Sequence, residues 1–477
     1  MTTKYVKLNQ EFLWVGMGDM QQNSLKKRQL LTLCLGLVLS SVFCSPLWAQ
    51  GHSDAVFPEG FMWGSATAAY QVEGGIRNDW TVAGVDAGEA VGHWQDYEKD
   101  FDALQAMGHT LYRMSLSWAR IEPQPGQFDE AALQHYRKML QALKQRHIRP
   151  MVTLFHFTAP QWFAEKGGWT RAENIADFER FVSRVSAYFA EDVYYWNTVN
   201  EPLVYAFRSY DEGAWPPFQK NREQALTVAK NLVVAHGKAY RIIHRQDPLA
   251  SVGFAKHISV LAPHWPLNPA DQAMTALQSY LFNDLFWQAL KTGEMNLRIP
   301  GYRPIEIPYD PLLQNTVDYL GVNFYSRYYI EASGKNIVTP EAPKTELNWA
   351  ISPEGFKTAL QRATPYARHF RVPIIVTENG LADHDDNVRP GFLVHHLKAM
   401  HEAIAEGAPV AGYLHWSAID NFEWTDGYKP QFGLMTRDRV WRPSAYLYQE
   451  VIQKNALPFH WLAKYPLQGE KTPLVTE

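Results

Sequence analysis

Eight short apolar runs, separated by longer segments with helical spacing, constrain the fold of this chain more than any other feature. Each run is rich in β-branched and aromatic residues and is apolar almost throughout, which is typical of strands buried on both faces. The eight runs cover residues 62–68, 110–118, 149–156, 193–200, 251–257, 319–325, 372–378 and 411–416.

The segments between these runs have the spacing of amphipathic helices. The clearest of them are residues 96–107, 129–146, 174–189, 223–245 and 391–406. Strands that alternate with helices pair in parallel, because each helix carries the chain back to the start of the next strand. Eight such units predict an α/β fold, a single (β/α)8 TIM barrel with extended loops after its strands. A doubly wound sheet has the same rhythm, but no glycine-rich phosphate loop follows the first run.

The length of the chain, 477 residues, allows either one large barrel or several smaller domains. No linker and no low-complexity stretch interrupts the sequence after residue 56. We therefore expect one barrel domain at residues 56–455. A short lead at residues 50–55 would precede it, and a C-terminal tail at residues 456–477 would follow it.

Residues 1–49 are typical of a secretory signal peptide. The basic group Lys26-Lys27-Arg28 precedes an apolar stretch at residues 30–44, and the small residue Ala49 follows. This stretch is short for a membrane span, which needs about 17–25 residues. We expect cleavage near Ala49 and export to the periplasm or the cell exterior, with no stable membrane association afterwards. Both cysteines lie in this segment, so the mature chain would form no disulfide.

Charge and motif content argue against several classes of protein. The net charge of −4 comes without a basic stripe, which argues against a nucleic-acid partner. We expect no metal, because His396 and His401 are five residues apart where a shared metal on a helix needs four. We also expect no cofactor. A serine hydrolase is disfavoured, because no Gly-X-Ser-X-Gly motif occurs.

Two glutamates directly follow predicted strands and are candidate catalytic residues. Glu201 stands in an Asn-Glu-Pro triplet after the fourth run, and Glu378 stands in a Glu-Asn-Gly triplet after the seventh. In a barrel the C-terminal ends of all strands meet at one mouth, where active sites lie. A structural ion pair is the alternative for each glutamate, because an unpaired buried carboxylate is costly. Two facing carboxyls suit cleavage of a glycosidic bond.

Further motifs occur in a fixed order between Phe57 and about Asn455. They lie at residues 61–74, 112–115, 200–202, 377–380, 415–417, 420–424 and 432–434. In this order they resemble glycoside hydrolase family 1, the β-glucosidase family. The resemblance implies a (β/α)8 barrel and a retaining, exo-acting β-glycosidase, with a β-glucosidase as the first expectation.

The resemblance also implies roles for individual residues. Glu378 would be the nucleophile, and Glu201 would be the general acid and then the general base. Arg113 would keep Glu378 ionised, Tyr325 would orient it, and the negative charge of Glu378 would raise the pKa of Glu201. The sugar-binding residues that the resemblance implies are Gln71, His156, Asn200, Asn323, Trp349, Trp416, Glu423 and Trp424.

Glu423 bears on the substrate class. Family members that cleave phosphorylated sugars usually replace this acid, so Glu423 implies an unphosphorylated β-glucoside or short β-linked oligosaccharide as the small-molecule partner. The same motifs serve glucosides, galactosides and fucosides. Two alternatives stay open at this point: a transglycosidase that passes the sugar to another acceptor, and a catalytically silent sugar-binding barrel.

Overall fold

The structure is a computed structural model that describes residues 53–299, 301–338 and 342–465. The predicted signal peptide, residues 50–52 of the predicted lead and residues 466–477 of the predicted tail lie outside the described residues. Within the described ranges, no helix combines the length and the apolar character that crossing a lipid bilayer requires.

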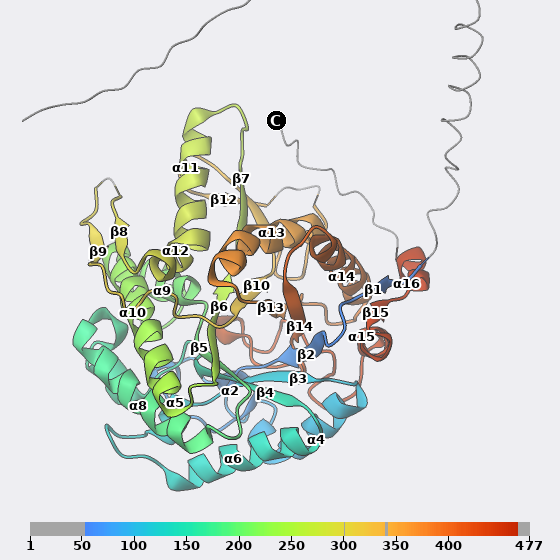
Figure 1. The fold of residues 1–477 in the computed structure, drawn as a ribbon, viewed down its shortest axis with the longest axis horizontal. Coiled ribbons are helices and arrows are strands. Elements are labelled where there is room, and N and C mark those ends of the chain that lie inside the picture. Colours follow the sequence, from blue (N-terminus) through green and yellow to red (C-terminus); the bar gives the residue numbers. More distant parts are fainter. Residues whose placement is uncertain (1–52, 300, 339–341, 466–477) are drawn as a thin grey trace, which may run out of the picture. The chain divides into compact units, whose positions relative to one another are not determined.

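Eight parallel strands close into a barrel (Figure 1). In chain order they are β2 (Met62–Ala66), β3 (Leu111–Ser115), β4 (Arg149–Phe155), β5 (Tyr195–Asn200), β6 (Ser251–His257), β10 (Leu320–Phe324), β13 (Ile374–Asn379) and β14 (Val410–Trp416). Each strand pairs in parallel with the next, and β14 pairs with β2, which closes the ring. The predicted (β/α)8 barrel is therefore confirmed, and each strand lies within its predicted apolar run to within one residue.

Burial on both faces explains why these strands have almost continuous apolar sequences. Every residue of β2, β3, β10 and β13 is buried. The helices cover the outer side of the strands, and side chains fill the interior. The interior also contains Arg113 of β3 and Thr153 of β4, both with no exposed surface. A buried guanidinium in the barrel needs partners, and it finds them at the C-terminal ends of the strands, as described below.

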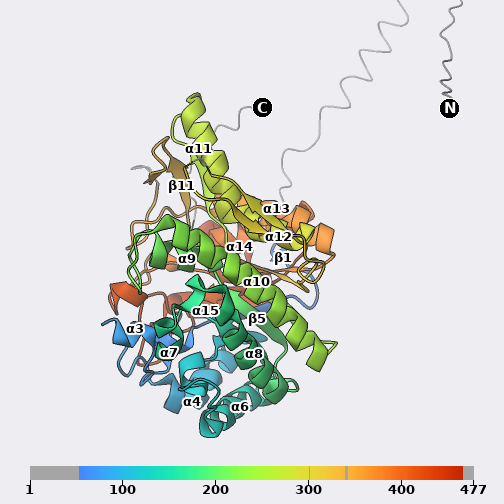
Figure 2. The same cartoon turned by 90° about the vertical axis from the view of Figure 1, so that its left-hand side faces the viewer.

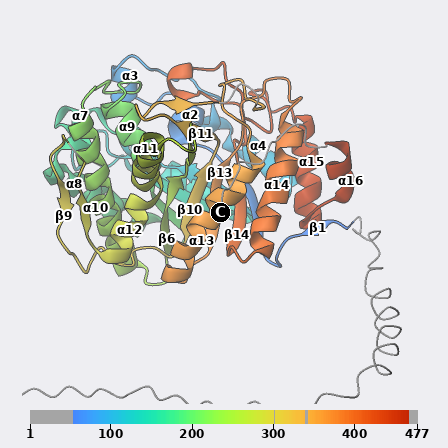
Figure 3. The ribbon, with the colours of Figure 1, turned by 90° about the horizontal axis from the view of Figure 1, so that it is seen from above.

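Helices surround the barrel (Figures 1 and 3). The longest are α4 (His93–Ala106), α6 (Glu130–Gln145), α8 (Ile175–Phe189), α10 (Arg222–Gln246), α13 (Pro353–Phe370), α14 (Arg389–Ala405) and α15 (Pro443–Lys454). Five of them agree with the predicted helices to within three residues. Their starts follow from capping: the side chains of Asp129 and Asn221 accept backbone N–H groups in the first turns of α6 and α10.

Long loops after β6 and β10 carry a small sheet and a helix of their own. The sheet contains β7 (Val260–Pro263), β11 (Arg327–Ile330) and β12 (Asn336–Ile337). Helix α11 (Pro269–Ser279) packs beside it, and both views show α11 extending beyond the ring of helices (Figures 1 and 2). A π-helical turn at Tyr280–Asp284 joins α11 to α12 (Leu285–Thr292).

The two ends of the domain meet beside the barrel. Strand β1 (Ala55–Val56) pairs antiparallel with β15 (Ala456–Leu457), and α16 (Phe459–Lys464) follows. The predicted C-terminal tail thus begins inside this pairing, and its first ten residues contribute to the fold.

Candidate active site

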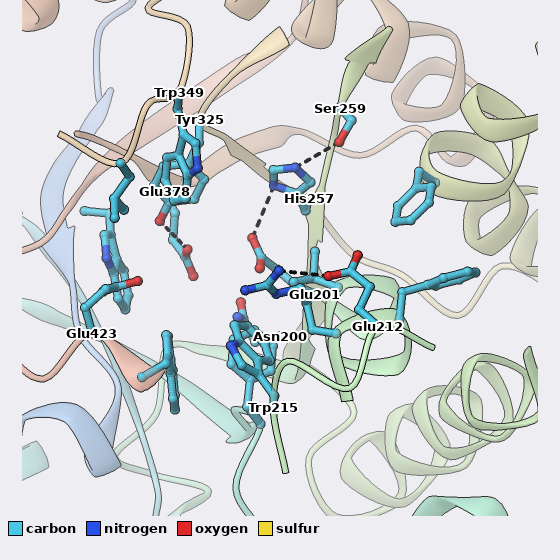
Figure 4. A pocket seen from close by; sticks show the side chains of 18 of the residues that line it. Asn200, Glu201, Glu212, Trp215, His257, Ser259, Tyr325, Trp349, Glu378 and Glu423 are labelled. Atoms are coloured by element: carbon cyan, nitrogen blue, oxygen red, sulfur yellow. Dashed lines mark hydrogen bonds and ion pairs between the residues drawn. The ribbon is translucent and has the colours of Figure 1, made fainter. Parts of the chain in front are cut away.

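A cavity of about 430 Å³ lies where the barrel strands end (Figure 4). Its size is within the range of small-molecule sites. Nine of the twelve predicted site residues line it: His156, Asn200, Glu201, Tyr325, Trp349, Glu378, Trp416, Glu423 and Trp424. The other three, Gln71, Arg113 and Asn323, form hydrogen bonds with lining residues. The barrel thus brings all twelve side chains to one site, although they are spread over more than 350 residues of sequence.

Both carboxyl oxygens of Glu378 are held by other residues. Arg113 forms an ion pair with Oε1, and the hydroxyl of Tyr325 donates to Oε2 at 2.7 Å. Arg113 is itself fixed, because its Nε donates to Thr153 Oγ1 at 3.0 Å and its Nη2 donates to Asn200 Oδ1 at 2.6 Å. The Glu378 carboxyl therefore has one orientation, which faces Glu201 across the cavity (Figure 4).

Position 380, two residues after Glu378, has no room for a side chain. A Cβ at this position would lie only 1.8 Å from the carbonyl oxygen of Trp416, at the end of β14. Because this clash would be with a backbone atom, it could be relieved only by moving the ends of both strands. The close approach of these two strand ends, which positions Glu378 and Trp416, thus depends on the missing side chain.

Glu201 lies on a strained piece of backbone between β5 and helix α9 (Pro202–Tyr210). Its φ angle of 40° is in the left-handed region, where a residue with a side chain costs about 1–3 kcal/mol. Asn323 Nδ2 donates to Glu201 Oε1 at 2.8 Å, and His257 Nδ1 lies 3.5 Å from the same oxygen. Among the described residues, Glu201 Oε2 has no hydrogen-bonding partner. Backbone strain of this kind is common in catalytic residues.

The two carboxyls differ in how strongly the site favours their ionised forms. Burial raises the pKa of Glu378 to about 7; Arg113 opposes this rise, and the negative charge of Glu201 adds to it. Burial also acts against ionisation of Glu201, but His257, Asn323 and Arg113 outweigh it and lower the pKa of Glu201. The sequence predicted the reverse order. That prediction was wrong, because it took no account of the full burial of Glu378 or of the imidazole beside Glu201.

Asn323 has a different place from the one predicted. Both polar atoms of its side chain bind protein groups, because Nδ2 donates to Glu201 and Oδ1 accepts from Thr377 Oγ1 at 2.6 Å. Its side chain is fully buried behind Glu201. It therefore orients a carboxyl and does not line the cavity.

The side chains of His156 and Gln71 each have a buried polar atom that forms no hydrogen bond with the described residues. Burial and the charge of Arg113 lower the pKa of His156 well below its usual value, so its ring is neutral. The amide of Asn200 donates to Nε2 of His156 at 3.0 Å, which leaves Nδ1 with the ring proton. That Nδ1, and Oε1 of Gln71, are buried without a partner among the described residues. A hydroxyl-rich ligand would satisfy both.

Glu423 is protonated near neutral pH. Burial, followed by the charges of Asp426 and Glu378, raises its pKa to about 8. Gln71 Nε2 donates to Glu423 Oε2 at 3.3 Å. A protonated carboxyl both donates and accepts hydrogen bonds, which suits recognition of two neighbouring hydroxyls.

Aromatic rings form much of the cavity wall. Trp416 and Trp424 lie close to His156, with ring centroids 5.9 Å and 5.7 Å from it. Trp349 packs against Tyr325, with ring centroids 5.6 Å apart. Trp215, which the sequence did not single out, lies 5.9 Å from Trp424. It follows α9 in a long loop, where no periodic pattern marks it.

His257 is another lining residue that the sequence did not single out. It is the last residue of β6, and its ring lies beside Glu201. The signal was present, because the sequence placed residue 257 at the end of a predicted strand, where barrel active sites are built.

Comparisons with known proteins agree with this geometry. The family model described as Glycosyl hydrolase family 1 matches residues 53–457. Beta-glucosidase A of Thermotoga maritima is 30% identical over 443 residues, which are 84% of this chain and 98% of the relative. A chloroplastic galactolipid galactosyltransferase of Arabidopsis thaliana is 30% identical over 390 residues, 76% of this chain and 58% of the relative. A beta-glycosidase structure from Pyrococcus horikoshii matches with a TM-score of 0.80 and 32% identity, covering 87% of this chain and 99% of that one.

Proposed function

The chain belongs to glycosyl hydrolase family 1 and is a glycoside hydrolase, and from this membership we propose that it is a retaining, exo-acting β-glucosidase. The observation that carries the proposal is the unequal support of two facing carboxyls. Glu378 has both oxygens fixed by Arg113 and Tyr325, as a nucleophile requires. The contacts that the described residues make with the carboxyl of Glu201 are to Oε1, so Oε2 is available to the oxygen of a leaving group.

The first step forms a glycosyl-enzyme. A carboxylate oxygen of Glu378 attacks the anomeric carbon, and the bond from that carbon to the glycosidic oxygen breaks. Glu201 gives its proton to the departing oxygen. The productive form therefore has Glu378 ionised and Glu201 protonated. The burial of Glu378 and the groups around Glu201 act against this distribution of protons, whereas Arg113 and Tyr325 favour the ionised form of Glu378.

The second step releases the sugar. Glu201, now ionised, takes a proton from water, and the water oxygen attacks the anomeric carbon from the side that the leaving group left. The ester bond to Glu378 breaks, and the carboxylate returns to its ion pair with Arg113. Two inversions give a product with the configuration of the substrate.

An unphosphorylated sugar fits the charges around the cavity. An ionised Glu423 would repel a phosphate, but the raised pKa of Glu423 weakens this repulsion near neutral pH. A second observation supports the same substrate class. Among the described residues that line the cavity, Arg208 is the only lysine or arginine, and it is paired with Glu212 at 2.8 Å. A phosphate would lack a free cation.

A panel of 4-nitrophenyl β-glycosides tests the proposal. We expect release of nitrophenol from the glucoside, with the β-anomer of the sugar formed first when the reaction is followed by proton NMR. The α-anomer as first product would show an inverting enzyme. A lack of turnover on glucosides, galactosides and fucosides alike would refute the glycosidase assignment.

Transfer to an acceptor other than water is the second candidate function. The resemblance to a galactolipid galactosyltransferase supports it, since transfer would use the same glycosyl-enzyme. Product analysis with added alcohols or sugars separates the two. We expect mostly free sugar; transfer products that dominate at millimolar acceptor would instead identify a transglycosidase.

We also propose that the enzyme is exported, on the basis of the signal-like residues 1–49. The N-terminal sequence of the protein recovered from the periplasm or medium of an expressing bacterium would test this. A start near residue 50 is expected, whereas an uncleaved protein in the cytoplasm would overturn it.

A further inference from the structure

The steps above give no role to the imidazole of His257, although its Nδ1 lies 3.5 Å from Oε1 of Glu201. The residue is the last of β6, and only 17% of its side chain is exposed. Figure 4 shows the ring between Glu201 and Ser259. Its Nε2 lies 3.1 Å from the hydroxyl oxygen of Ser259. The ring thus connects a catalytic carboxyl to a hydroxyl group.

The backbone around His257 is held firmly. The backbone N–H of Ser259 donates to Asn283 Oδ1 at 2.9 Å, and Asn283 Nδ2 donates back to the carbonyl of Ser259 at 2.8 Å. Asn283 is fully buried in the π-helical turn. From the other side, the buried Lys256 Nζ donates to the carbonyl of His257 at 2.7 Å and also bonds the carbonyl of Phe282 in the same turn. These hydrogen bonds fix the backbone at His257 and Ser259, and with it the position of the imidazole.

This arrangement can serve both protonation states of Glu201. A neutral imidazole has one donor and one acceptor nitrogen, and a serine hydroxyl can donate or accept. When Glu201 is ionised, Nδ1–H donates to it and the Ser259 hydroxyl donates to Nε2. When Glu201 is protonated, its proton lies on Oε2, which faces the leaving group, and Nδ1–H still donates to Oε1. A neutral carboxyl is a weaker acceptor than a carboxylate, so the imidazole favours the ionised form.

We propose that His257 is a positioning residue for the acid/base carboxyl, which supports both protonation states of Glu201 and favours its ionised form. The inference rests on the proposed function of Glu201. In the first step the imidazole holds Oε1 while the proton on Oε2 goes to the departing oxygen, and in the second step it stabilises the ionised base.

Other charged or titratable groups also act on Glu201 from the surrounding strands. They are Arg113 of β3, Lys256 of β6, Tyr325 after β10, Glu378 of β13 and Glu423 after β14. Arg113 favours ionisation too, yet its N–H groups already bind Glu378, Asn200 and Thr153. The burial of Lys256 lowers its pKa to about 7, and its ammonium group is turned to backbone carbonyls.

The experiment is the pH profile of His257→Phe on two aryl β-glucosides. With 4-methylphenyl glucoside, a poor leaving group, kcat/KM along the alkaline limb is proportional to the protonated fraction of Glu201. Because His257 favours the ionised form, its removal should move this limb to higher pH and raise the rate several-fold above the wild-type limb. With 2,4-dinitrophenyl glucoside, which needs no acid, this limb should not shift. The acid limb of kcat, which reports Glu201 as base, should move upward.

Matched variants make the outcome specific. Ser259→Ala should shift the same limbs in the same direction by less, and His257→Gln, which keeps a neutral donor, should fall between wild type and His257→Phe. His264→Phe, directly after β7 and packed against Trp265, should change neither limb. An active His257→Phe with unshifted limbs would overturn the proposal; if that variant does not fold, unshifted limbs in both Ser259→Ala and His257→Gln would do so. A wild-type enzyme without glycosidase activity would instead refute the proposed function.

Discussion

Tyr325→Phe is the sharpest test of how the nucleophile is prepared. The substitution removes one oxygen atom and leaves the ring packed against Trp349. It takes away the 2.7 Å hydrogen bond to Oε2 of Glu378, while the ion pair of Oε1 with Arg113 stays. The hydroxyl lowers the pKa of Glu378, which burial has raised to about 7. Its loss should therefore raise that pKa further and leave Glu378 protonated over a wider range of pH.

The size of the effect follows from the strength of such a bond. A hydrogen bond to a charged group contributes about 1.5–3 kcal/mol, and ~1.4 kcal/mol corresponds to a factor of ten. Below the pKa of Glu378, kcat/KM is proportional to the ionised fraction of Glu378. It should fall there by roughly 10- to 150-fold. Well above the pKa of Glu378 in both enzymes, where this carboxyl is ionised, the loss should be much smaller.

The assay is kcat/KM for 4-nitrophenyl β-glucoside across the pH range, with circular dichroism to confirm folding. Tyr329→Phe, on β11 and outside the cavity lining, is the matched control and should behave as wild type. A loss that is equal at every pH would show that Tyr325 acts on the substrate and not on the ionisation of Glu378. A folded variant with an unchanged profile would refute the reasoning altogether.

Three further predictions test other parts of the site. Glu378→Ala should abolish hydrolysis, and azide should restore turnover with an inverted glycosyl azide. Glu201→Ala should keep activity on 2,4-dinitrophenyl glucoside and give a glycosyl azide of retained configuration. The opposite pattern of products by NMR would exchange the two roles. Gly380→Ala places a Cβ 1.8 Å from Trp416 O, so we expect about 1–3 kcal/mol lower stability in urea denaturation, and an unchanged midpoint would contradict the close approach. The pKa of Glu423 is raised to about 8, so affinity for a neutral sugar inhibitor should weaken as pH rises past that value and become flat in Glu423→Gln; a slope that survives in the variant would exclude Glu423 as its source.

The barrel was predictable because each strand carries its own signal. Burial on both faces forces a run of apolar residues, and the run ends where the chain reaches the mouth. The two glutamates were visible for the same reason, since a carboxyl directly after such a run is out of place in a core. The small sheet was not predicted, because β7 is only half-buried along its whole length and has no continuous apolar pattern.

The electrostatics of the site could not be predicted from motifs alone. The order of the two carboxyl pKa values depends on how deeply Glu378 is buried and on which ring lies beside Glu201. Neither can be read from the residues next to them in sequence. His257 reaches Glu201 from a neighbouring strand, and the side chain of Asn323 turns behind the same carboxyl because Thr377 holds its oxygen.

The closure of the ring by β14 on β2 has a consequence for the order of events in synthesis. Met62 pairs with Gly412, 350 residues later, and Trp63 Nε1 donates to Asn455 Oδ1 at 2.9 Å. At 5–20 residues per second, a ribosome needs roughly 20–70 s to make the intervening chain. Throughout that interval β2 has no partner on one edge, so the barrel cannot be complete until β14, residues 410–416, has been added. A nascent chain of this topology therefore remains without a closed barrel for tens of seconds during its synthesis.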